Sequence, residues 1–97
     1  MIVIKNVEYL LRYVSMNTYN KIIKNKNDYV LELLGDNFID VDLNIRYLIK
    51  YGVKNIDNYI FNNIEDLIMK HNDFIDKISD YESNLSKEEV IALIENM

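Results

Sequence analysis

The stretch VDLNIRYLIKYGV, residues 41–53, decides the fold of this chain. Its aliphatic residues recur at spacings of three and four, which places them on one side of an α-helix. Gly52 then stands where a helix is expected to end, because glycine readily takes the left-handed conformation that closes a helix. The stretch predicts a helix that Gly52 stops and that buries one apolar stripe, formed by Val41, Ile45, Leu48 and Ile49.

A similar pattern lies 38 residues earlier in the chain. Alignment of 3–31 with 41–69 gives ten identical positions, where this composition gives about three by chance. We therefore predict two helical repeat units, about 3–40 and 41–73, and a truncated unit over 74–97, which bury each other's apolar faces. Composition bias is the alternative explanation, since four of the ten identities are Asn. The identities are Val3/Val41, Asn6/Asn44, Tyr9/Tyr47, Leu10/Leu48, Tyr13/Tyr51, Asn17/Asn55, Asn20/Asn58, Ile22/Ile60, Asn25/Asn63 and Asp28/Asp66.

Apolar residues at helical spacing continue through the rest of the chain, which has no Pro and only two Gly to interrupt them. They predict helices over about 3–14 and 86–97, with shorter helices around 19–23, 30–34, 56–61 and 74–81. Residues 64–69 either continue the helix around 56–61 or begin another. Ile, Val and Tyr also favour strands, but no segment sustains an alternation of period two. The predicted fold is all-α, a bundle or short solenoid of about six to eight short helices in a single domain, 1–97.

Local signals predict where several helices begin and end. Asn27 is expected to cap the helix around 30–34, and Gly35 to close it with a positive φ. A linker over 35–40 follows, and Asp40 or Asp42 caps the next helix. For the last helix, the predicted capping box and hydrophobic staple consist of Ser86 with Glu89 and Leu85 with Val90.

The composition excludes several kinds of site. The chain has no Cys and one His, which excludes disulfides, Cys-ligated zinc or iron–sulfur sites and a two-His metal site within one chain. Gly35 and Gly52 are isolated, so the sequence has no Gly-rich phosphate loop. We therefore expect no metal, no cofactor and no enzymatic activity.

The net charge of −5 is unevenly distributed, with +3 over 1–30 and −8 over 31–97. This balance argues against nucleic acid as the partner, because nucleic-acid binders gain affinity when Lys and Arg release counterions. An acidic surface instead suits a protein partner with a basic surface. No apolar run is long enough for a signal-peptide core or a membrane span, so we expect a cytoplasmic protein, of a cell or of a host, without membrane contact.

The candidate catalytic and metal-ligating residues have simple structural interpretations. His71 lies at a predicted helix junction, where its charge would stabilise the C-terminus of the preceding helix. A calcium loop starting at Asp40 requires Gly at its sixth position and Glu at its twelfth, where this chain has Ile45 and Tyr51. A solvated helix face is the expected role of the acidic run Asp73, Asp76, Asp80 and Glu82.

Two tyrosine pairs occupy equivalent positions of the predicted repeat, Tyr9 with Tyr13 and Tyr47 with Tyr51. On a helical wheel they lie away from the aliphatic stripe. Three interpretations are open: packing between repeat units, an aromatic surface for a partner, and stacking on nucleic-acid bases. The equivalent residues Arg12 and Lys50 lie beside this tyrosine face.

The runs NIRYLIKYGV, residues 44–53, and VEYLLRYV, residues 7–14, resemble repeats of the mitochondrial transcription termination factor family. Repeats of that family have a Leu-rich helix ending in Leu-Gly-Val, a second helix, and a turn with Pro and two aliphatic residues. Leu67 and Ile68 match the aliphatic residues, Asp66 stands near the Pro position, and Val14 replaces the Gly. The resemblance implies a superhelix of short helices that binds nucleic acid.

We predict a small non-enzymatic helical protein–protein interaction module, an adaptor, inhibitor or regulator. It would dock its tyrosine face on a protein partner or on another copy of itself. The predicted partner-binding residues are Tyr9, Tyr13, Tyr47, Tyr51, Arg12 and Lys50. The alternative is a nucleic-acid-binding repeat protein that also uses Lys5, Lys21, Lys24, Lys26 and Arg46.

Overall fold

The computed structural model describes residues 6–97, and within them the fold is all-α, as predicted. Predictions that involve Val3, Ile4 and Lys5 lie outside the described residues. The elements in chain order are η1 (Glu8–Arg12), α1 (Met16–Asn25), α2 (Asp28–Asp36), α3 (Phe38–Tyr51), α4 (Ile56–Asn62), η2 (Asp66–Ile68), α5 (His71–Glu82) and α6 (Lys87–Glu95), where η denotes a 3-10 helix.

The predicted caps explain several of these boundaries. The Asn27 side chain accepts a hydrogen bond from the Val30 N–H at 2.9 Å and begins α2. Ser86 and Glu89 form the predicted capping box of α6. Gly52 ends α3 with a φ of 119°, a left-handed value that only glycine adopts without strain.

The junction between α2 and α3 differs from the prediction. Gly35 lies inside α2 and has no positive φ, and the expected linker over 35–40 is reduced to Asn37. A Cβ added at Gly35 would lie 3.3 Å from the backbone nitrogen of Asn6, so this glycine allows a close approach of two segments rather than a turn. The expected caps Asp40 and Asp42 lie inside α3, which begins at Phe38.

The helix predicted over 3–14 is also shorter than expected within the described residues. The segment forms the 3-10 helix η1 and ends at Tyr13. The chain must leave the helix there because Ser15 takes an extended backbone and caps α1, accepting a hydrogen bond from the Thr18 N–H at 3.1 Å.

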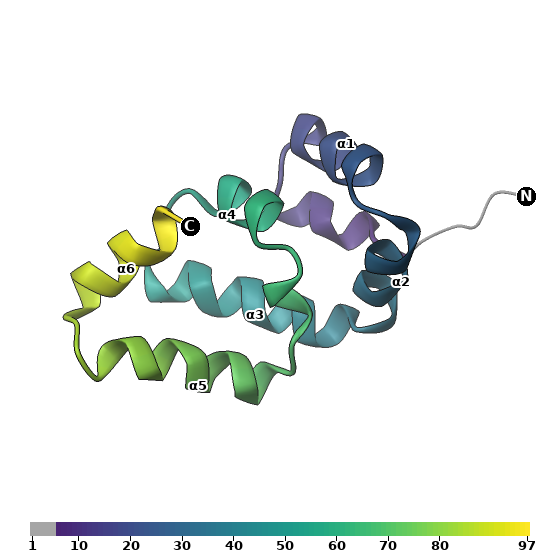
Figure 1. The fold of residues 1–97 in the computed structure, drawn as a ribbon. Coiled ribbons are helices and arrows are strands. Elements are labelled where there is room, and N and C mark those ends of the chain that lie inside the picture. Colours follow the sequence, from purple (N-terminus) through teal and green to yellow (C-terminus); the bar gives the residue numbers. More distant parts are fainter. Residues whose placement is uncertain (1–5) are drawn as a thin grey trace, which may run out of the picture.

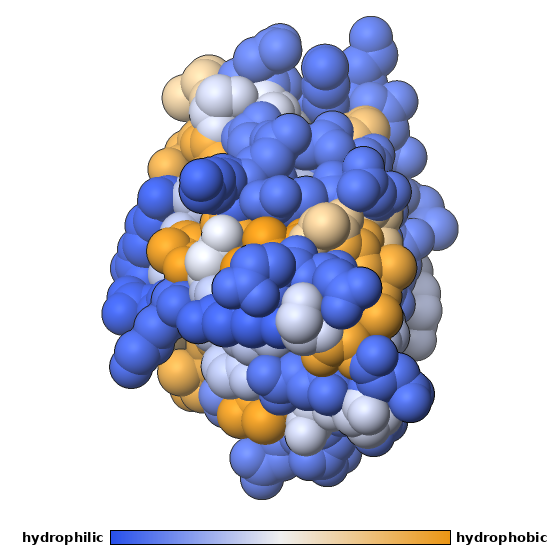
Figure 2. Space-filling model, turned by 90° about the vertical axis from the view of Figure 1, so that its left-hand side faces the viewer, coloured by the Kyte–Doolittle hydropathy of each residue, from blue (hydrophilic) through white to orange (hydrophobic). Residues whose placement is uncertain are grey.

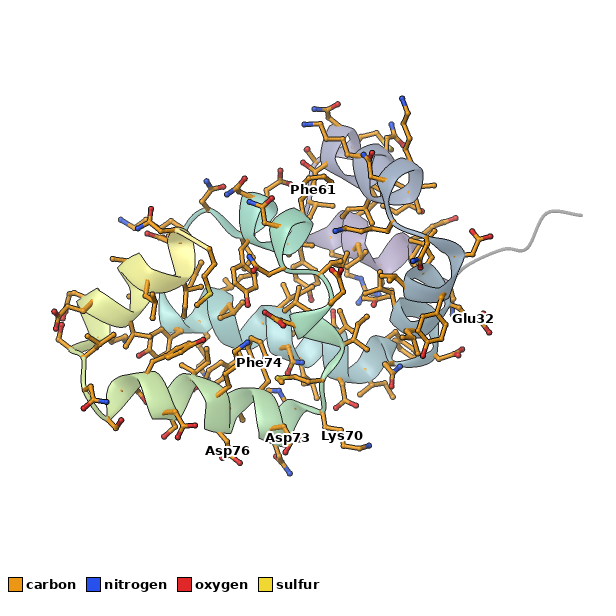
Figure 3. The ribbon with its side chains drawn as sticks, in the orientation of Figure 1. Glu32, Phe61, Lys70, Asp73, Phe74 and Asp76 are labelled. Carbon is orange, nitrogen blue, oxygen red and sulfur yellow. The ribbon has the colours of Figure 1, made fainter. Side chains whose placement is uncertain are left out.

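Helix α3 is the centre of the molecule, and η1, α2, α4, η2 and α5 all pack against it (Figure 1). Helix α1 packs on α4 and η1, and α6 packs on α5 and α4. One continuous core runs through these elements, and in Figure 3 Phe74 points from α5 toward α3 while Asp73 and Asp76 point away. None of the helices within 6–97 combines the length and apolar character needed to cross a bilayer.

The predicted repeat has a counterpart in the pattern of burial. Val7, Leu10 and Ile22 are buried, and so are the residues 38 positions later, Ile45, Leu48 and Ile60. The same shift places α1 over the segment that contains α4. The repeat nevertheless stays a prediction, because η1 is a short 3-10 helix whereas its counterpart is the second half of α3.

Candidate functional site

The four tyrosines of the predicted partner surface are half-buried and pack against the core. The Tyr9 hydroxyl donates to the carbonyl oxygen of Leu34 at 2.8 Å, which joins η1 to α2. The Tyr51 hydroxyl donates to Glu82 Oε2 at 2.9 Å, which joins α3 to α5. These contacts favour the packing interpretation, in which the rings hold neighbouring elements together.

Tyr47 completes this packing between α3 and α5. Its ring meets the rings of His71 and Phe74 edge-on, with centroids 6.1 and 6.4 Å apart.

The pKa of Tyr51 is raised to about 12, mainly by desolvation and to a lesser extent by the hydrogen bond to Glu82. Burial also raises the pKa of Tyr9. Both phenols are therefore held in their neutral form.

Tyr13 belongs to a charged cluster around Asp42 on α3. Asp42 accepts a hydrogen bond from the Tyr13 hydroxyl and forms ion pairs with Arg46 at 2.9 Å and with Arg12 at 3.7 Å. The Asp42 side chain is only 18% exposed, whereas those of Arg12 and Arg46 are 63% and 62% exposed. The two guanidinium groups therefore face solvent around one nearly buried carboxylate.

The exposed side of α3 gathers apolar side chains next to this cluster. Four of the eight exposed large apolar residues within 6–97 lie on this one helix, and Ile39 is 63% exposed. They include Ile49, which the sequence pattern places in the buried stripe; it is exposed because the packed side of α3 turns the other way. We name this surface the α3 face and define it by Phe38, Ile39, Leu43, Arg46, Ile49 and Lys50.

The other exposed apolar residues are spread over three elements. Met16 and Ile23 lie on α1, Tyr29 on α2 and Leu93 on α6. Figure 2 shows the end of the molecule that carries α6 and the C-terminal ends of α3 and α5. Hydrophilic side chains separate its apolar patches from one another.

The basic residues of the nucleic-acid alternative do not form one stripe. Lys21, Lys24 and Lys26 lie on or directly after α1, whereas Arg46 lies on α3, and η1 is placed between these helices (Figure 1). Lys26 Nζ is 3.6 Å from Glu65 and 5.4 Å from the centroid of the Phe61 ring. Lys5 lies outside the described residues.

We expected His71 to stabilise the C-terminus of the preceding helix, but it is the first residue of α5. Its ring Nδ1 is 2.8 Å from Asn44 Oδ1, and its backbone N–H donates to Asp40 Oδ1 at 3.1 Å. Asn44 is fully buried and donates to the carbonyl oxygens of Leu67 at 3.0 Å and Met69 at 2.9 Å. The sequence signal for Asn44 was its identity with Asn6 in the repeat, which gave no indication of this role.

The contacts of Asn44 indicate which ring nitrogen of His71 carries a proton. Because its amide nitrogen donates to two carbonyls, the amide oxygen is the atom that faces His71. His71 Nδ1 must therefore carry a proton, and Nε2 is left as the acceptor of the neutral ring.

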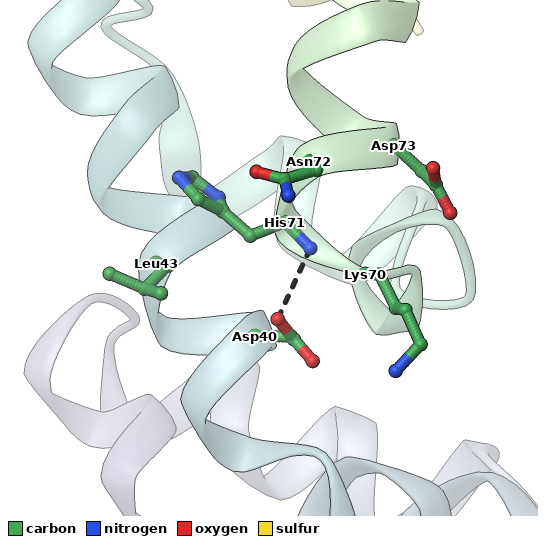
Figure 4. A pocket seen from close by; sticks show the side chains of 6 residues that line it. All are labelled: Asp40, Leu43, Lys70, His71, Asn72 and Asp73. Atoms are coloured by element: carbon green, nitrogen blue, oxygen red, sulfur yellow. Dashed lines mark hydrogen bonds between the residues drawn. The ribbon is translucent and has the colours of Figure 1, made fainter.

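A pocket of about 420 Å³ lies beside this imidazole, between α3 and the start of α5 (Figure 4). Its lining mixes opposite charges and one apolar residue of the α3 face, with Asp40, Leu43, Lys70, His71, Asn72 and Asp73. Across residues 6–97, no group of three or more His, Asp or Glu side chains is arranged to hold a metal ion. The pocket therefore adjoins the α3 face at Leu43 without forming a metal centre of its own.

No protein-family model matches the chain, and neither does any curated protein or solved structure. The resemblance to mitochondrial transcription termination factor repeats thus stays a prediction.

Proposed function

We propose that this protein is a small, non-enzymatic helical interaction module that docks a protein partner on its α3 face. The observation that carries the proposal is the gathering of Phe38, Ile39, Leu43 and Ile49 on the exposed side of one helix. Single exposed apolar residues are ordinary on protein surfaces, but contiguous apolar patches mark interaction sites.

The composition of the α3 face supports this proposal. Arg46 and Lys50 extend the stripe of Ile39 and Leu43 at helical spacing, so apolar and charged side chains share one side of the helix. Exposed arginine beside large apolar residues is typical of protein interfaces. Arg12, a predicted partner-binding residue like Lys50, adjoins the face through Asp42.

The proposal moves the docking surface away from the tyrosine face. The rings of Tyr9, Tyr13, Tyr47 and Tyr51 are half-buried. The hydroxyls of Tyr9, Tyr13 and Tyr51 bind groups of this chain. A partner would have to displace these contacts to use the tyrosines. The apolar side chains of the α3 face are already exposed, although the ring of Phe38 also lies 6.1 Å from that of Tyr9.

An affinity capture from the source cell or host, with the full chain as bait, tests the proposal. The double variant Ile39→Asp/Leu43→Asp places two charges in the α3 face, and the matched control Met16→Asp/Leu93→Asp places two charges at exposed apolar residues elsewhere. Circular dichroism and thermal unfolding establish that both variants remain folded.

We expect the wild type and the control to capture a protein partner that resists nuclease treatment. The Ile39→Asp/Leu43→Asp variant, called the α3 variant below, should capture at least tenfold less of it. Equal capture by all three baits would contradict the proposal. Recovery of nuclease-sensitive material alone would favour the nucleic-acid alternative instead.

A further inference from the structure

We infer that the partner presents an acidic amphipathic helix to the α3 face, an inference that rests on the proposed function and specifies its partner. The first observation is charge. Arg12, Arg46 and Lys50 are exposed around the apolar residues, and Asp42 is the one carboxylate of the cluster. Asp40, which lines the pocket next to Leu43, adds a second carboxylate at the edge of this surface, so its surplus is one positive charge. A partner that docks here has to supply negative charge, in contrast to the basic partner surface that the net charge of −5 led us to expect.

The contacts of Arg46 leave it able to take a second carboxylate. Its ion pair with Asp42 and its hydrogen bond to the Tyr13 hydroxyl at 3.0 Å both use Nε. The side chain is 62% exposed, and neither of these two contacts uses its terminal nitrogens. A guanidinium donates in a planar fork, so a carboxylate of the partner fits this position well.

Charge and apolar residues are also ordered along the helix. Phe38, Ile39 and Leu43 occupy the first half of the α3 face. Arg46 and Lys50 occupy the second half, together with the exposed Ile49. Helix α3 has 14 residues and is therefore about 21 Å long. A partner helix of similar length matches it when apolar residues lie on one half of its exposed face and carboxylates on the other.

A second copy of this chain does not supply such a helix. Its acidic surface is concentrated at the C-terminal end, where residues 71–97 carry seven Asp or Glu and two Lys. Helix α5 contributes four of these carboxylates, but none of the exposed large apolar residues within 6–97 lies on it. Helix α6 contributes the other three, but it has only nine residues and one exposed large apolar residue, Leu93. The α3 face of a second copy would bring the same surplus of positive charge.

The probe for a direct test is a synthetic alanine-rich helical peptide of about 18 residues, long enough to form a helix of several turns. It carries two leucines four residues apart, followed three residues later by two glutamates four residues apart, the spacing of Ile39, Leu43, Arg46 and Lys50. The control peptide has lysine in place of both glutamates. Binding to the ¹⁵N-labelled full chain is followed through amide chemical shifts.

We expect the glutamate peptide to shift amides of the α3 face with a dissociation constant of about 10–500 μM, because one helix–helix contact is small for an interface. The lysine peptide should bind at least tenfold more weakly. Raising the salt concentration from about 50 mM to 500 mM should increase the dissociation constant of the glutamate peptide several-fold, because salt screens exposed charges. Lys50→Glu should reverse the preference between the peptides, and the control Lys24→Glu on α1 should leave it unchanged.

Equal binding of both peptides, binding at another surface, or no binding of either peptide would overturn the inference. So would sedimentation that shows self-association of the wild type and its loss in Ile39→Asp/Leu43→Asp, because the occupant would then be a second copy. These failures are separable from a failure of the proposed function. A partner that the α3 variant no longer captures would keep the docking surface and change only the chemistry of the partner.

Discussion

Asn44 is the buried side-chain amide on which the centre of the molecule depends. It joins α3 to the chain on both sides of Ile68 and to His71. Asn44→Leu would leave one buried and one partly buried carbonyl without this donor, so we expect it to lower the free energy of unfolding by about 2–4 kcal/mol. Urea unfolding measures this change. The same substitution at exposed Asn20 on α1 is the control, and an equal effect of both would show that the hydrogen bonds of Asn44 contribute little.

The same contacts predict the tautomer of His71. We expect the neutral imidazole to carry its proton on Nδ1, because Asn44 Oδ1 can only accept. Long-range ¹H–¹⁵N correlation spectra distinguish the two nitrogens directly. Detection of the Nε2–H tautomer in the neutral ring would mean that the Asn44 amide is oriented the other way.

Tyr51 predicts how stability changes at alkaline pH. Its pKa is raised from 10.0 to about 12, first by desolvation and then by the hydrogen bond to Glu82. The unfolded chain therefore loses this proton at lower pH than the folded chain does. The contribution is fully present below pH 10 and is lost as the pH rises toward 12. We expect Tyr51→Phe to lose less stability than the wild type over this range, as measured by urea unfolding at each pH. An identical pH profile in both proteins would show that the pKa of Tyr51 is not raised in the folded chain.

At the scale of the element, the capping box of α6 is the clearest local device. Ser86 accepts from the Glu89 N–H at 3.2 Å, and Glu89 accepts from the Ser86 N–H at 2.9 Å. We expect Ser86→Ala to cost about 1 kcal/mol of stability. Ser79→Ala in the exposed interior of α5 should cost nothing, since alanine is the better helix former.

The same box lowers the pKa of Glu89, chiefly through its hydrogen bond to the Ser86 backbone. A lowered pKa stabilises the fold above the pKa of the unfolded chain, and this contribution is lost as the pH falls. Ser86→Ala keeps the backbone N–H that lowers this pKa most, so carboxyl ¹³C shifts should show the pKa of Glu89 rising only part of the way toward its ordinary value. An ordinary pKa of Glu89 in the wild type would indicate that the reciprocal bond does not form.

The elements also show which boundaries a sequence can predict. Asn27, Ser86 and Gly52 act through atoms within four residues, so their roles were predictable from local pattern. Gly35 looked like a second helix end, but its role depends on Asn6, which is distant in sequence and adjacent only in the fold. The same holds for Asn44, whose partners belong to the segment that follows α4.

At the scale of the whole molecule, the periodicity predicted the core better than the surface. Val41, Ile45 and Leu48 are buried as expected, whereas Ile49 belongs to the same predicted apolar stripe and is exposed. The spacing of apolar residues predicts which of them lie on the same side of a helix. How many of them are buried depends on the five elements that pack around α3. For this reason the sequence indicated an interaction protein, while the α3 face became visible only in the assembled fold.

The predicted repeat raises the question of whether the units fold separately. The core is one cluster that includes Ile22 of α1 and Ile60 of α4, and these two helices pack on each other. We therefore expect a single cooperative transition, in which Ile22→Ala and Ile60→Ala each cost about 2–5 kcal/mol. Ile23→Ala, at an exposed neighbour on α1, should cost less than about 1 kcal/mol.

Circular dichroism and tyrosine fluorescence, recorded during the same urea titration, measure both the cost and the cooperativity. Coincident transitions in Ile22→Ala are expected, because Ile22 belongs to the single core cluster that also contains the buried residues of α3. A solenoid of independent units would behave differently, since each unit contributes its own stability and neighbours couple only at their interface. In that case Ile22→Ala would unfold residues 6–40 first and leave the amides of 41–97 protected from hydrogen exchange, and the two optical probes would separate.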